Sequence, residues 1–364
     1  MPHDRPYERD SIARLAAYTP GEQPASRDVV KLNTNENPYP PSVAVLQAIR
    51  TIDGESLRRY PPPNAAEFRK AAAQVHGVTP EQVIATNGGD ELLRMVVAAF
   101  CEPCGERGEG GLGVAEPSYS LYPVLAATHN TPIVRVPLGP AFDLPQDLAQ
   151  RWNDAGCRLA VLVNPHAPSG RLESVEALRS VAERFRGVLV IDEAYVDFAS
   201  HDALPLVREG LPNVLLLRTL SKGYSLAGLR LGYGVGHAGL VATLDKTRDS
   251  YNTDILAQRA AVAALASRDD AARSWAAVIS ERQRLSRALV ARGFDVLPSQ
   301  SNFILATPPA QLPPARAMYL ALKERGVFVR YFDQDRLRER LRITVGTPAQ
   351  NDRFLSALDE VARA

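Results

Sequence analysis

Residues 214–231 read Val-Leu-Leu-Leu-Arg-Thr-Leu-Ser-Lys-Gly-Tyr-Ser-Leu-Ala-Gly-Leu-Arg-Leu. This stretch is the most informative part of the sequence, because it predicts both a buried strand and a ligand site. The apolar run Val214–Leu217 predicts a strand that is buried on both faces of a parallel sheet. Lys222 follows at the rim of that sheet, where α/β folds bind their ligands. Partial desolvation and nearby cations lower the pKa of a lysine and make it a nucleophile. The donors that a phosphate needs stand around it: Thr219, Ser221 and Arg230. By itself, a lysine after a strand is more often a solvated loop residue, so a functional role for Lys222 needs support from other parts of the sequence.

Strands and helices alternate between residues 83 and 235. Apolar runs predict further strands at Val83–Ala85, Ile133–Val136, Leu159–Val163 and Val188–Ile191. Helical spacing predicts helices over 92–100 and 173–185. This alternation predicts an α/β fold with a mainly parallel, doubly wound sheet. Four strand ends would then lie along one edge and form one shared site: Thr86, Asn164, Asp192 and Thr219.

After residue 254 the pattern changes to long helices and short strands. The expected helices cover 255–293, 315–325 and 350–362. The expected strands are Asp295–Leu297, Ser301–Leu305, Val327–Arg330 and Leu341–Val345. We therefore expect an N-terminal arm (1–40), a large cofactor-binding domain (41–255) and a small α+β domain (256–364).

Composition excludes several classes of protein. The chain has 364 residues and a net charge of +1, so nothing indicates binding to nucleic acid or to an anionic membrane. No apolar run approaches the roughly 20 residues that span a bilayer, and the N-terminus lacks the apolar core of a signal peptide. The three cysteines form no disulfide framework, which favours a cytoplasmic location. Cys101 and Cys104 have CxxC spacing without a second pair, so we expect no metal site.

Three loops are candidates for ligand binding. Lys31–Pro41 combines amides, an acid and prolines, and is either a linker or a substrate-facing loop. Thr86–Glu91 places Gly88 and Gly89 at a strand-to-helix junction, where backbone N–H groups bind anions, although a plain turn capped by Asp90 fits equally well. No Gly-Lys-Ser/Thr follows it, so it is not a Walker loop. The glycine-rich segment Gly105–Gly113 is expected to be a flexible surface loop.

Together these residues fit a site for pyridoxal phosphate (PLP). Lys222 would hold the cofactor's aldehyde as a Schiff base, and Asp192 would keep the pyridine nitrogen protonated. Tyr119 offers a ring for stacking on the pyridine. The candidate phosphate donors are Gly88, Gly89, Thr219, Ser221 and Arg230.

The order of these motifs resembles a known family over nearly the whole chain. The chain is similar to fold-type I PLP-dependent aminotransferases, and most similar to the histidinol-phosphate aminotransferase family. The most discriminating blocks are Lys31-Leu-Asn-Thr-Asn-Glu-Asn-Pro-Tyr39 and Leu341-Arg-Ile-Thr-Val-Gly-Thr347. Asp192-Glu-Ala-Tyr195 and Ser221-Lys222 are shared with many relatives.

The resemblance implies a role for each matching position. Lys222, Asp192 and Tyr195 would be the catalytic residues, with the Tyr195 hydroxyl bonded to the phenolic oxygen of PLP. The expected cofactor-binding set adds Gly88, Gly89, Asp90, Tyr119, Asn164, Thr219, Ser221 and Arg230, and also Tyr60 from a partner subunit. The resemblance thus implies a homodimer with shared sites, to which the N-terminal arm contributes. The expected substrate-binding residues are Tyr18, Asn35, Tyr251, Arg330 and Arg342.

One position departs from the family pattern. Family members commonly read Asn-Pro-Asn-Asn-Pro-Thr-Gly, where this chain reads Asn164-Pro-His-Ala-Pro-Ser-Gly170. Ala167 replaces an asparagine that would donate to the phenolic oxygen of PLP. His166 and Asn164 are the two residues that this loop offers as replacements.

The implied reaction is transamination, with histidinol phosphate as amino donor and 2-oxoglutarate as acceptor, in histidine biosynthesis. Lys222 would act as the general base that removes the Cα proton. Two relatives of the same fold stay open as alternatives: an aromatic (phenylalanine) aminotransferase and a threonine-phosphate decarboxylase. A PLP-binding protein without turnover is more remote, because Lys222, Asp192 and Arg230 are all present. A nicotinamide dehydrogenase is a weaker alternative still, because no G-x-G-x-x-G follows the first strand.

Overall fold

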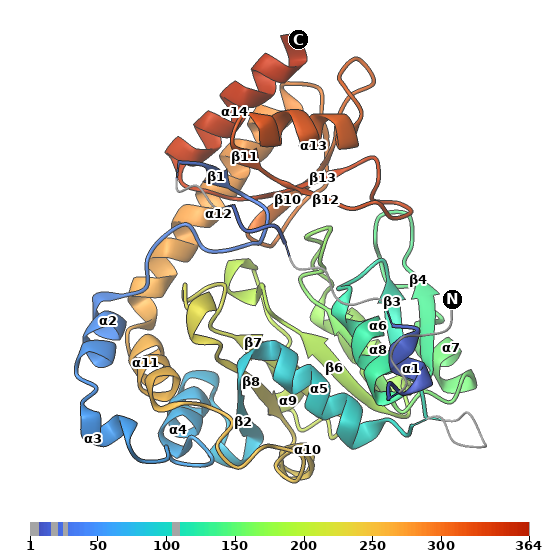
Figure 1. The fold of residues 1–364 in the computed structure, drawn as a ribbon. Helices are drawn as coiled ribbons and strands as arrows, with labels where there is room; N and C mark the ends of the chain where they lie inside the picture. Colours follow the sequence, from blue (N-terminus) through green and yellow to red (C-terminus); the bar gives the residue numbers. More distant parts are fainter. Residues whose placement is uncertain (1–6, 16–20, 25–27, 104–109, 364) are drawn as a thin grey trace.

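A seven-stranded sheet forms the centre of the lower, larger part of the molecule (Figure 1). The computed structural model describes residues 7–15, 21–24, 28–103 and 110–363. The strands lie in the order β2 (Val83–Thr86), β8 (Gly232–Gly236), β7 (Val214–Thr219), β6 (Val188–Asp192), β5 (Leu159–Val163), β3 (Leu112–Glu116) and β4 (Ile133–Pro137). Only β8 runs antiparallel to its neighbours β2 and β7. The predicted α/β fold with a mainly parallel sheet is confirmed.

Helices cover both faces of this sheet because alternate side chains of each strand point to opposite faces. On one face, Val161, Val190 and Leu215 pack with α5 (Gly88–Phe100), α6 (Leu121–His129) and α10 (Ala238–Leu244). On the other face, Ala160, Leu162 and Ile191 belong to a second core cluster. Helices of the lower part that contribute to that cluster include α4 (Ala66–His76), α7 (Leu148–Asp154), α8 (Val175–Arg184), α9 (Leu204–Arg208) and α11 (Ile255–Ala266).

The upper, smaller part is built around an antiparallel sheet in the order β12 (Arg330–Tyr331), β13 (Leu341–Thr344), β10 (Phe303–Thr307) and β9 (Asp295–Val296). Two helices, α13 (Ala315–Glu324) and α14 (Pro348–Arg363), pack beside it. β1 (Val30–Lys31) of the N-terminal arm pairs in parallel with β11 (Val327–Phe328), so the arm is anchored in this part.

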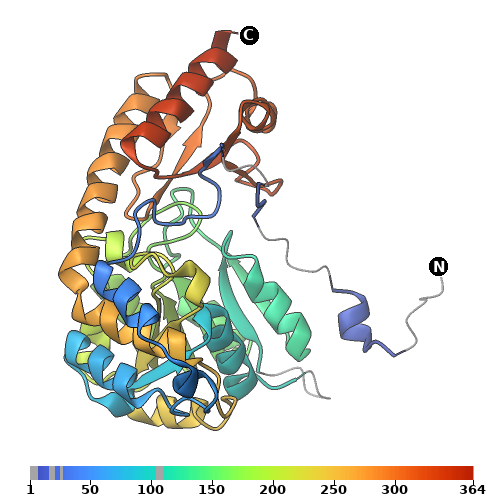
Figure 2. The ribbon, with the colours of Figure 1, turned by 60° about the vertical axis from the view of Figure 1, so that its left-hand side comes forward.

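A long helix, α12 (Arg268–Val290), runs along one side of the molecule and joins the two parts (Figure 2). The helical pattern expected over 255–293 is therefore two helices, separated at Ser267. α11 packs against α2 (Val43–Arg50) and α4, in the lower part. The division into a large and a small domain remains our proposal. The remaining α-helices of the described residues are the short helices α1 (Asp10–Ala13) and α3 (Gly54–Leu57).

The prediction of a surface loop over Gly105–Gly113 is wrong at its C-terminal end. Residues 104–109 lie outside the described residues, but Leu112–Glu116 is the buried strand β3 between β4 and β5. A Cβ atom on Gly113 would come within 2.8 Å of the Trp152 indole, so this strand contains glycine because an aromatic ring packs on its backbone. The strand expected over Val327–Arg330 is also divided, because β11 and β12 pair in different sheets.

Cys104 of the CxxC pair lies outside the described residues, whereas Cys101 and Cys157 are buried and unpaired. Over the described ranges, no group of His, Cys, Asp or Glu has the arrangement of a metal site. Within the same ranges, no helix combines the length and apolarity that crossing a bilayer requires.

Candidate active site

A cavity of about 260 Å³ opens where the carboxyl ends of the parallel strands meet the upper part of the molecule. Gly89 follows β2, Val163 ends β5, Asp192 ends β6 and Thr219 ends β7, and all four line the cavity. Of the four strand ends expected to form one shared site, Asp192 and Thr219 line the cavity, whereas Thr86 and Asn164 do not. The upper part contributes Arg330 and Arg342 among other residues, so the cavity lies between the two parts.

Most of the expected site residues line this cavity. They are Asn35, Gly89, Asp90, Tyr119, Asp192, Tyr195, Thr219, Ser221, Lys222, Arg230, Arg330 and Arg342. Four others do not line it: Gly88, Asn164, Tyr60 and Tyr251. Tyr18 lies outside the described residues.

Lys222 enters the cavity from the loop after β7. Its side chain is only partly exposed, and its Nζ donates to the carbonyl oxygen of Thr34 at 3.0 Å. Burial, followed by the nearby positive charge of Arg342, lowers the pKa of Lys222 to about 8. About a tenth of the amine is therefore neutral at pH 7, far more than for an ordinary lysine, and the neutral form is the one that acts as nucleophile or general base.

Asp192 lies at the end of β6 and is buried. Its Oδ2 accepts a hydrogen bond from the Tyr122 hydroxyl at 2.9 Å, and its Oδ1 accepts one from the Ala194 amide at 3.1 Å. Burial raises the pKa of Asp192 to about 6, although the hydrogen bond from Tyr122 opposes this rise. A carboxylate in this position favours a cationic partner, such as a protonated ring nitrogen. Sequence reasoning missed Tyr122, whose pairing with Asp192 depends on the packing of α6.

The N-terminus of α5 and Arg230 form an anion-binding cup. Gly88 has a φ of +76°, and a Cβ atom there would lie 2.7 Å from the Arg230 guanidinium. Glycine is needed because it allows this backbone conformation and leaves space for the guanidinium beside the helix N-terminus. The hydroxyls of Thr219 and Ser221 are joined by a hydrogen bond of 2.9 Å on the cavity wall.

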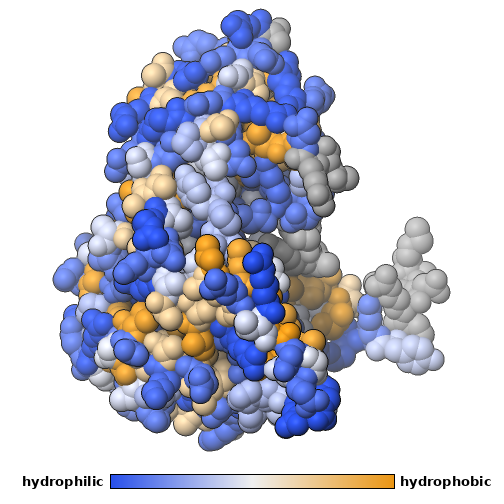
Figure 3. All heavy atoms as spheres, turned by 90° about the vertical axis from the view of Figure 1, so that its left-hand side faces the viewer, coloured by the Kyte–Doolittle hydropathy of each residue, from blue (hydrophilic) through white to orange (hydrophobic). Residues whose placement is uncertain are grey.

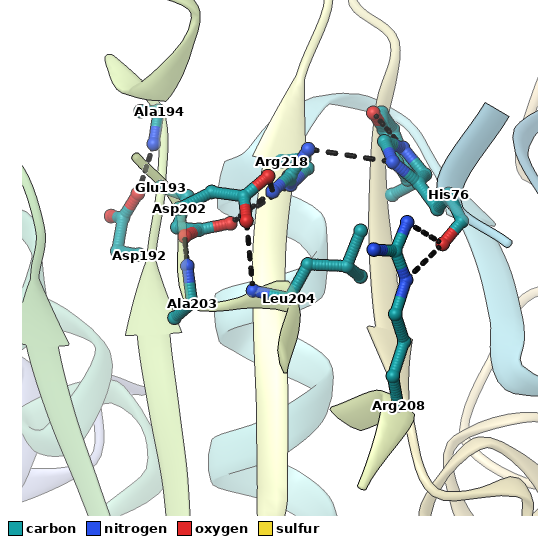
Figure 4. A network of polar contacts seen from close by, with 10 residues as sticks. His76, Asp192, Glu193, Ala194, Asp202, Ala203, Leu204, Arg208 and Arg218 are labelled. Carbon is teal, nitrogen blue, oxygen red and sulfur yellow. Dashed lines mark hydrogen bonds and ion pairs between the residues drawn. The ribbon is translucent and has the colours of Figure 1, made fainter. Parts of the chain in front are cut away.

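A buried ionic network lies near the carboxyl ends of β6 and β7 (Figure 4). Arg218 of β7 donates to Glu193 through Nε at 2.8 Å and to Asp202 through NH2 at 2.8 Å. Glu193 also accepts from the Ala203 amide at 2.7 Å, and burial raises its pKa. His76 lies 3.5 Å from the Arg218 guanidinium, and its pKa is lowered to about 3, chiefly by burial. This network ties β6 and β7 together next to Asp192 and Lys222.

Arg330 and Arg342 both contact one aromatic ring. Each guanidinium carbon is 5.2 Å from the centroid of Phe332, and all three residues line the cavity. Arg342 also donates to the Asn33 carbonyl oxygen at 3.1 Å. Two guanidinium groups that line one cavity suit a phosphate or carboxylate. Phe332 was not predicted, because its sequence context gives no signal for a cation–π contact.

The segment Asn33–Asn35 lines the cavity, so the part of Lys31–Pro41 that faces the cavity is these three residues. Its contacts to Lys222 and Arg342 use the backbone carbonyl oxygens of Thr34 and Asn33. Because every residue of a chain has a carbonyl oxygen, the sequence alone cannot predict which carbonyl oxygens make these contacts.

The residues present fit PLP. The cavity supplies an amine, a buried carboxylate, an anion-binding cup and an aromatic ring, through Lys222, Asp192, Arg230 and Tyr119. Asp192 supports this fit, because burial raises its pKa and a pyridinium cation beside it would stabilise the ionised carboxylate.

Comparison with known proteins agrees with this geometry. A sequence model of the family described as Aminotransferase class I and II matches residues 27–358, and the chain belongs to this family. A protein of Nostoc sp. named histidinol-phosphate aminotransferase 1 is 44% identical, over 98% of each chain. A protein of the same name from Burkholderia pseudomallei is 43% identical, over 98% of this chain and 99% of that protein. The crystal structure of histidinol-phosphate aminotransferase from Sinorhizobium meliloti in complex with pyridoxal-5'-phosphate superposes with a TM-score of 0.89, at 28% identity over 98% of each chain. The resemblance inferred from the motifs is confirmed.

Proposed function

We propose that this protein is a PLP-dependent aminotransferase that transfers the amino group of histidinol phosphate to 2-oxoglutarate, in histidine biosynthesis. The observation that carries the proposal is one cavity that joins Lys222, Asp192 and the Arg230 cup to the arginine pair Arg330 and Arg342. The names of relatives that are more than 40% identical over nearly the whole chain support the same donor.

PLP, when bound, supplies an electron sink for the bond that breaks at the donor's Cα atom. The buried Asp192 carboxylate would hold a proton on the ring nitrogen. Lys222 would hold the cofactor, and its Nζ, whose pKa is lowered to about 8, would then remove the Cα proton. The Tyr195 hydroxyl, which lines the cavity, would donate a hydrogen bond to the phenolic oxygen.

The other cavity residues would bind and orient the cofactor and the substrates. The cofactor phosphate would be held by the N-terminus of α5, with Gly89 and Asp90, and by the side chains of Thr219, Ser221 and Arg230. Tyr119 would stack on the cofactor ring. Arg330 and Arg342 bind the phosphate of histidinol phosphate and, in the second half-reaction, the carboxylates of 2-oxoglutarate. Because the arginines come from the upper part, its position against the lower part sets the space for the donor.

A homodimer with shared sites belongs to the same proposal. Tyr60 is 80% exposed and stacks on Tyr251, with a centroid distance of 4.3 Å, away from the cavity of its own chain. Val43, Leu46 and Leu57 of α2 and α3 are also exposed. Figure 3 views the face on which α2 and α3 lie and shows apolar groups gathered over its lower half. Such a patch supports contact with a second copy, and in the proposed dimer Tyr60 would reach the site of that copy. The buried, unpaired Cys101 and Cys157 support a cytoplasmic location.

The test is the donor preference of the enzyme reconstituted with PLP, with 2-oxoglutarate as acceptor. We expect kcat/KM for histidinol phosphate to exceed that for phenylalanine by about 100-fold or more, because the arginine pair recognises the phosphate. Lys222→Ala should abolish turnover with every donor. A higher kcat/KM for phenylalanine, or release of carbon dioxide from threonine phosphate, would contradict the proposed reaction.

A further inference from the structure

The carbonyl oxygen of Gly223, the residue directly after Lys222, accepts two side-chain hydrogen bonds. Nε1 of Trp275 donates to it at 2.7 Å, and Nδ2 of Asn37 donates to it at 3.0 Å. A carbonyl oxygen has two lone pairs, so both of its acceptor positions are used. Because an indole N–H only donates and a carbonyl oxygen only accepts, the direction of the bond from Trp275 is fixed.

The two donors are themselves held in place. Trp275 is buried in α12, and its ring meets the ring of Tyr224 edge to face, with a centroid distance of 5.3 Å. Asn37 Nδ2 also donates to Ser274 Oγ at 3.2 Å, and Asn37 Oδ1 accepts from the Tyr39 amide at 3.1 Å. Since Ser274 and Trp275 are adjacent in α12, this helix, the N-terminal segment and the loop after β7 meet at one point.

The backbone that follows Lys222 is restricted on its other sides. A Cβ atom on Gly223 would overlap the carboxylate of Asp197, so glycine is needed for this close approach. The Ser225 amide donates to the Lys222 carbonyl oxygen at 3.3 Å, which closes a turn. α12 holds this turn through the Gly223 carbonyl oxygen.

A fixed backbone matters most for Lys222 when its amine is not attached to the cofactor. The lysine side chain is a flexible four-carbon stem, so the position of a free Nζ depends on the backbone that carries it. In the structure, the bond from Nζ to the Thr34 carbonyl oxygen, at 3.0 Å, is the printed contact at the other end of the stem. Proton removal requires Nζ within hydrogen-bond reach of the proton, and a displacement of about 1 Å can cost about 100-fold in rate.

We propose that Trp275 is a positioning residue for Lys222: its indole N–H fixes the Gly223 carbonyl oxygen and thereby the place from which Lys222 Nζ removes the Cα proton. The inference rests on the proposed function, and it gives a role in the reaction to a residue of α12 that does not line the cavity.

The first test uses the apoenzyme and compares Trp275→Phe with Trp152→Phe. Both changes remove a buried indole, but the Trp152 N–H has no hydrogen-bond partner among the described residues, so Trp152→Phe is the matched control. Hydrogen–deuterium exchange of the peptide that contains residues 219–226 is followed by mass spectrometry. We expect exchange in this peptide to be about 5-fold faster in Trp275→Phe and unchanged in Trp152→Phe, because only the former loses a hydrogen bond to the turn.

The second test follows the bleaching of the yellow band of the holoenzyme by histidinol phosphate, without an acceptor. For Trp275→Phe we expect the maximal rate to fall about 10-fold, with the dissociation constant of PLP and the donor concentration at half-maximal rate within about 2-fold of the wild type. Deuterium on the donor's Cα atom should slow the variant at least as much as the wild type, because proton removal is the step that becomes slower.

A second replacement serves if Trp275→Phe does not fold. Benzothienylalanine keeps the bicyclic ring of tryptophan and removes only its N–H, and it can replace both tryptophans of the chain. Because Trp152 makes no hydrogen bond through its N–H within the described residues, the same exchange and isotope results are expected.

Equal exchange in Trp275→Phe and Trp152→Phe would overturn the inference, since the indole N–H would then not hold the turn. An isotope effect that disappears in Trp275→Phe would also overturn it, because a step other than proton removal would have become slow. Absence of a yellow band from the wild-type protein would instead contradict the proposed function, and the exchange result on the apoenzyme distinguishes the two failures.

Discussion

The hydroxyl of Tyr122 donates a hydrogen bond to Oδ2 of Asp192 at 2.9 Å, and this bond joins α6 to the carboxyl end of β6. Both residues are buried, and the bond opposes the rise in the pKa of Asp192 that burial causes. Tyr122 therefore helps to keep Asp192 ionised, as pairing with a pyridinium requires.

Tyr122→Phe should weaken PLP binding. Loss of one hydrogen bond to a charged group costs about 1.5–3 kcal/mol, so we expect the dissociation constant of PLP to rise about 10- to 150-fold. Titration of the visible band with PLP measures this constant. Tyr119→Phe is the matched control, because its hydroxyl lies 3.4 Å from Asp90 Oδ1 and its ring is kept. Equal constants for Tyr122→Phe and the wild type would contradict the role given to Tyr122.

The pKa of Lys222 makes a prediction about the apoenzyme. Because burial and Arg342 lower this pKa from 10.5 to about 8, the neutral amine becomes the major form above pH 8. The rate at which the yellow band forms after mixing with PLP should rise through pH 8 and level off above it. Arg342→Gln should move this midpoint upward, because it removes the second cause of the shift. A wild-type rate that continues to rise toward pH 10.5 would show that Lys222 has an ordinary pKa.

The Arg218 network predicts a large effect on stability. Arg218→Met should lower the free energy of unfolding by about 3–5 kcal/mol, because it leaves the buried Glu193 carboxylate without its partner. Adding Glu193→Gln should recover part of this loss, since the remaining side chain carries no charge. Urea denaturation of both variants measures the difference. A loss below about 1 kcal/mol in Arg218→Met would contradict the assignment of Arg218 as the counter-ion of Glu193.

Phe332 should affect the phosphorylated donor more than the cofactor. Phe332→Leu removes the ring against which Arg330 and Arg342 lie, so we expect KM for histidinol phosphate to rise about 5–10-fold. The yellow band should keep its intensity. Phe332→Tyr keeps the aromatic face and is the control, and histidinol serves as the matched donor without a phosphate. If KM for histidinol rises by the same factor, Phe332 does not act through phosphate recognition.

The residues that sequence analysis identified carry local signals. Asp192 and Lys222 each follow an apolar run that predicts a buried strand, and Gly88 and Gly89 stand at a strand-to-helix junction. Parallel strands bring such positions to one edge whatever the rest of the chain does. This is why a large part of the cavity lining was predictable.

The parts that were missed depend on tertiary packing. β8 has the sequence Gly-Tyr-Gly-Val-Gly, in which three of the five residues are glycines, a residue type depleted in strands. Its glycines are needed because a Cβ atom on Gly232 would lie 2.6 Å from the backbone of Gly88 and Gly89. Likewise, nothing close in the sequence pairs Tyr122 with Asp192 or Asn35 with Tyr195, since each bond joins residues far apart in the chain.

The most direct test of the proposed reaction is a half-reaction followed by visible absorption. The holoenzyme is mixed with histidinol phosphate without an acceptor, and 2-oxoglutarate is added afterwards. We predict that the yellow band disappears, that ketone forms in an amount equal to the number of active sites, and that 2-oxoglutarate restores the band. A band that histidinol phosphate leaves unchanged, while phenylalanine bleaches it, would contradict the assignment of histidinol phosphate as the amino donor.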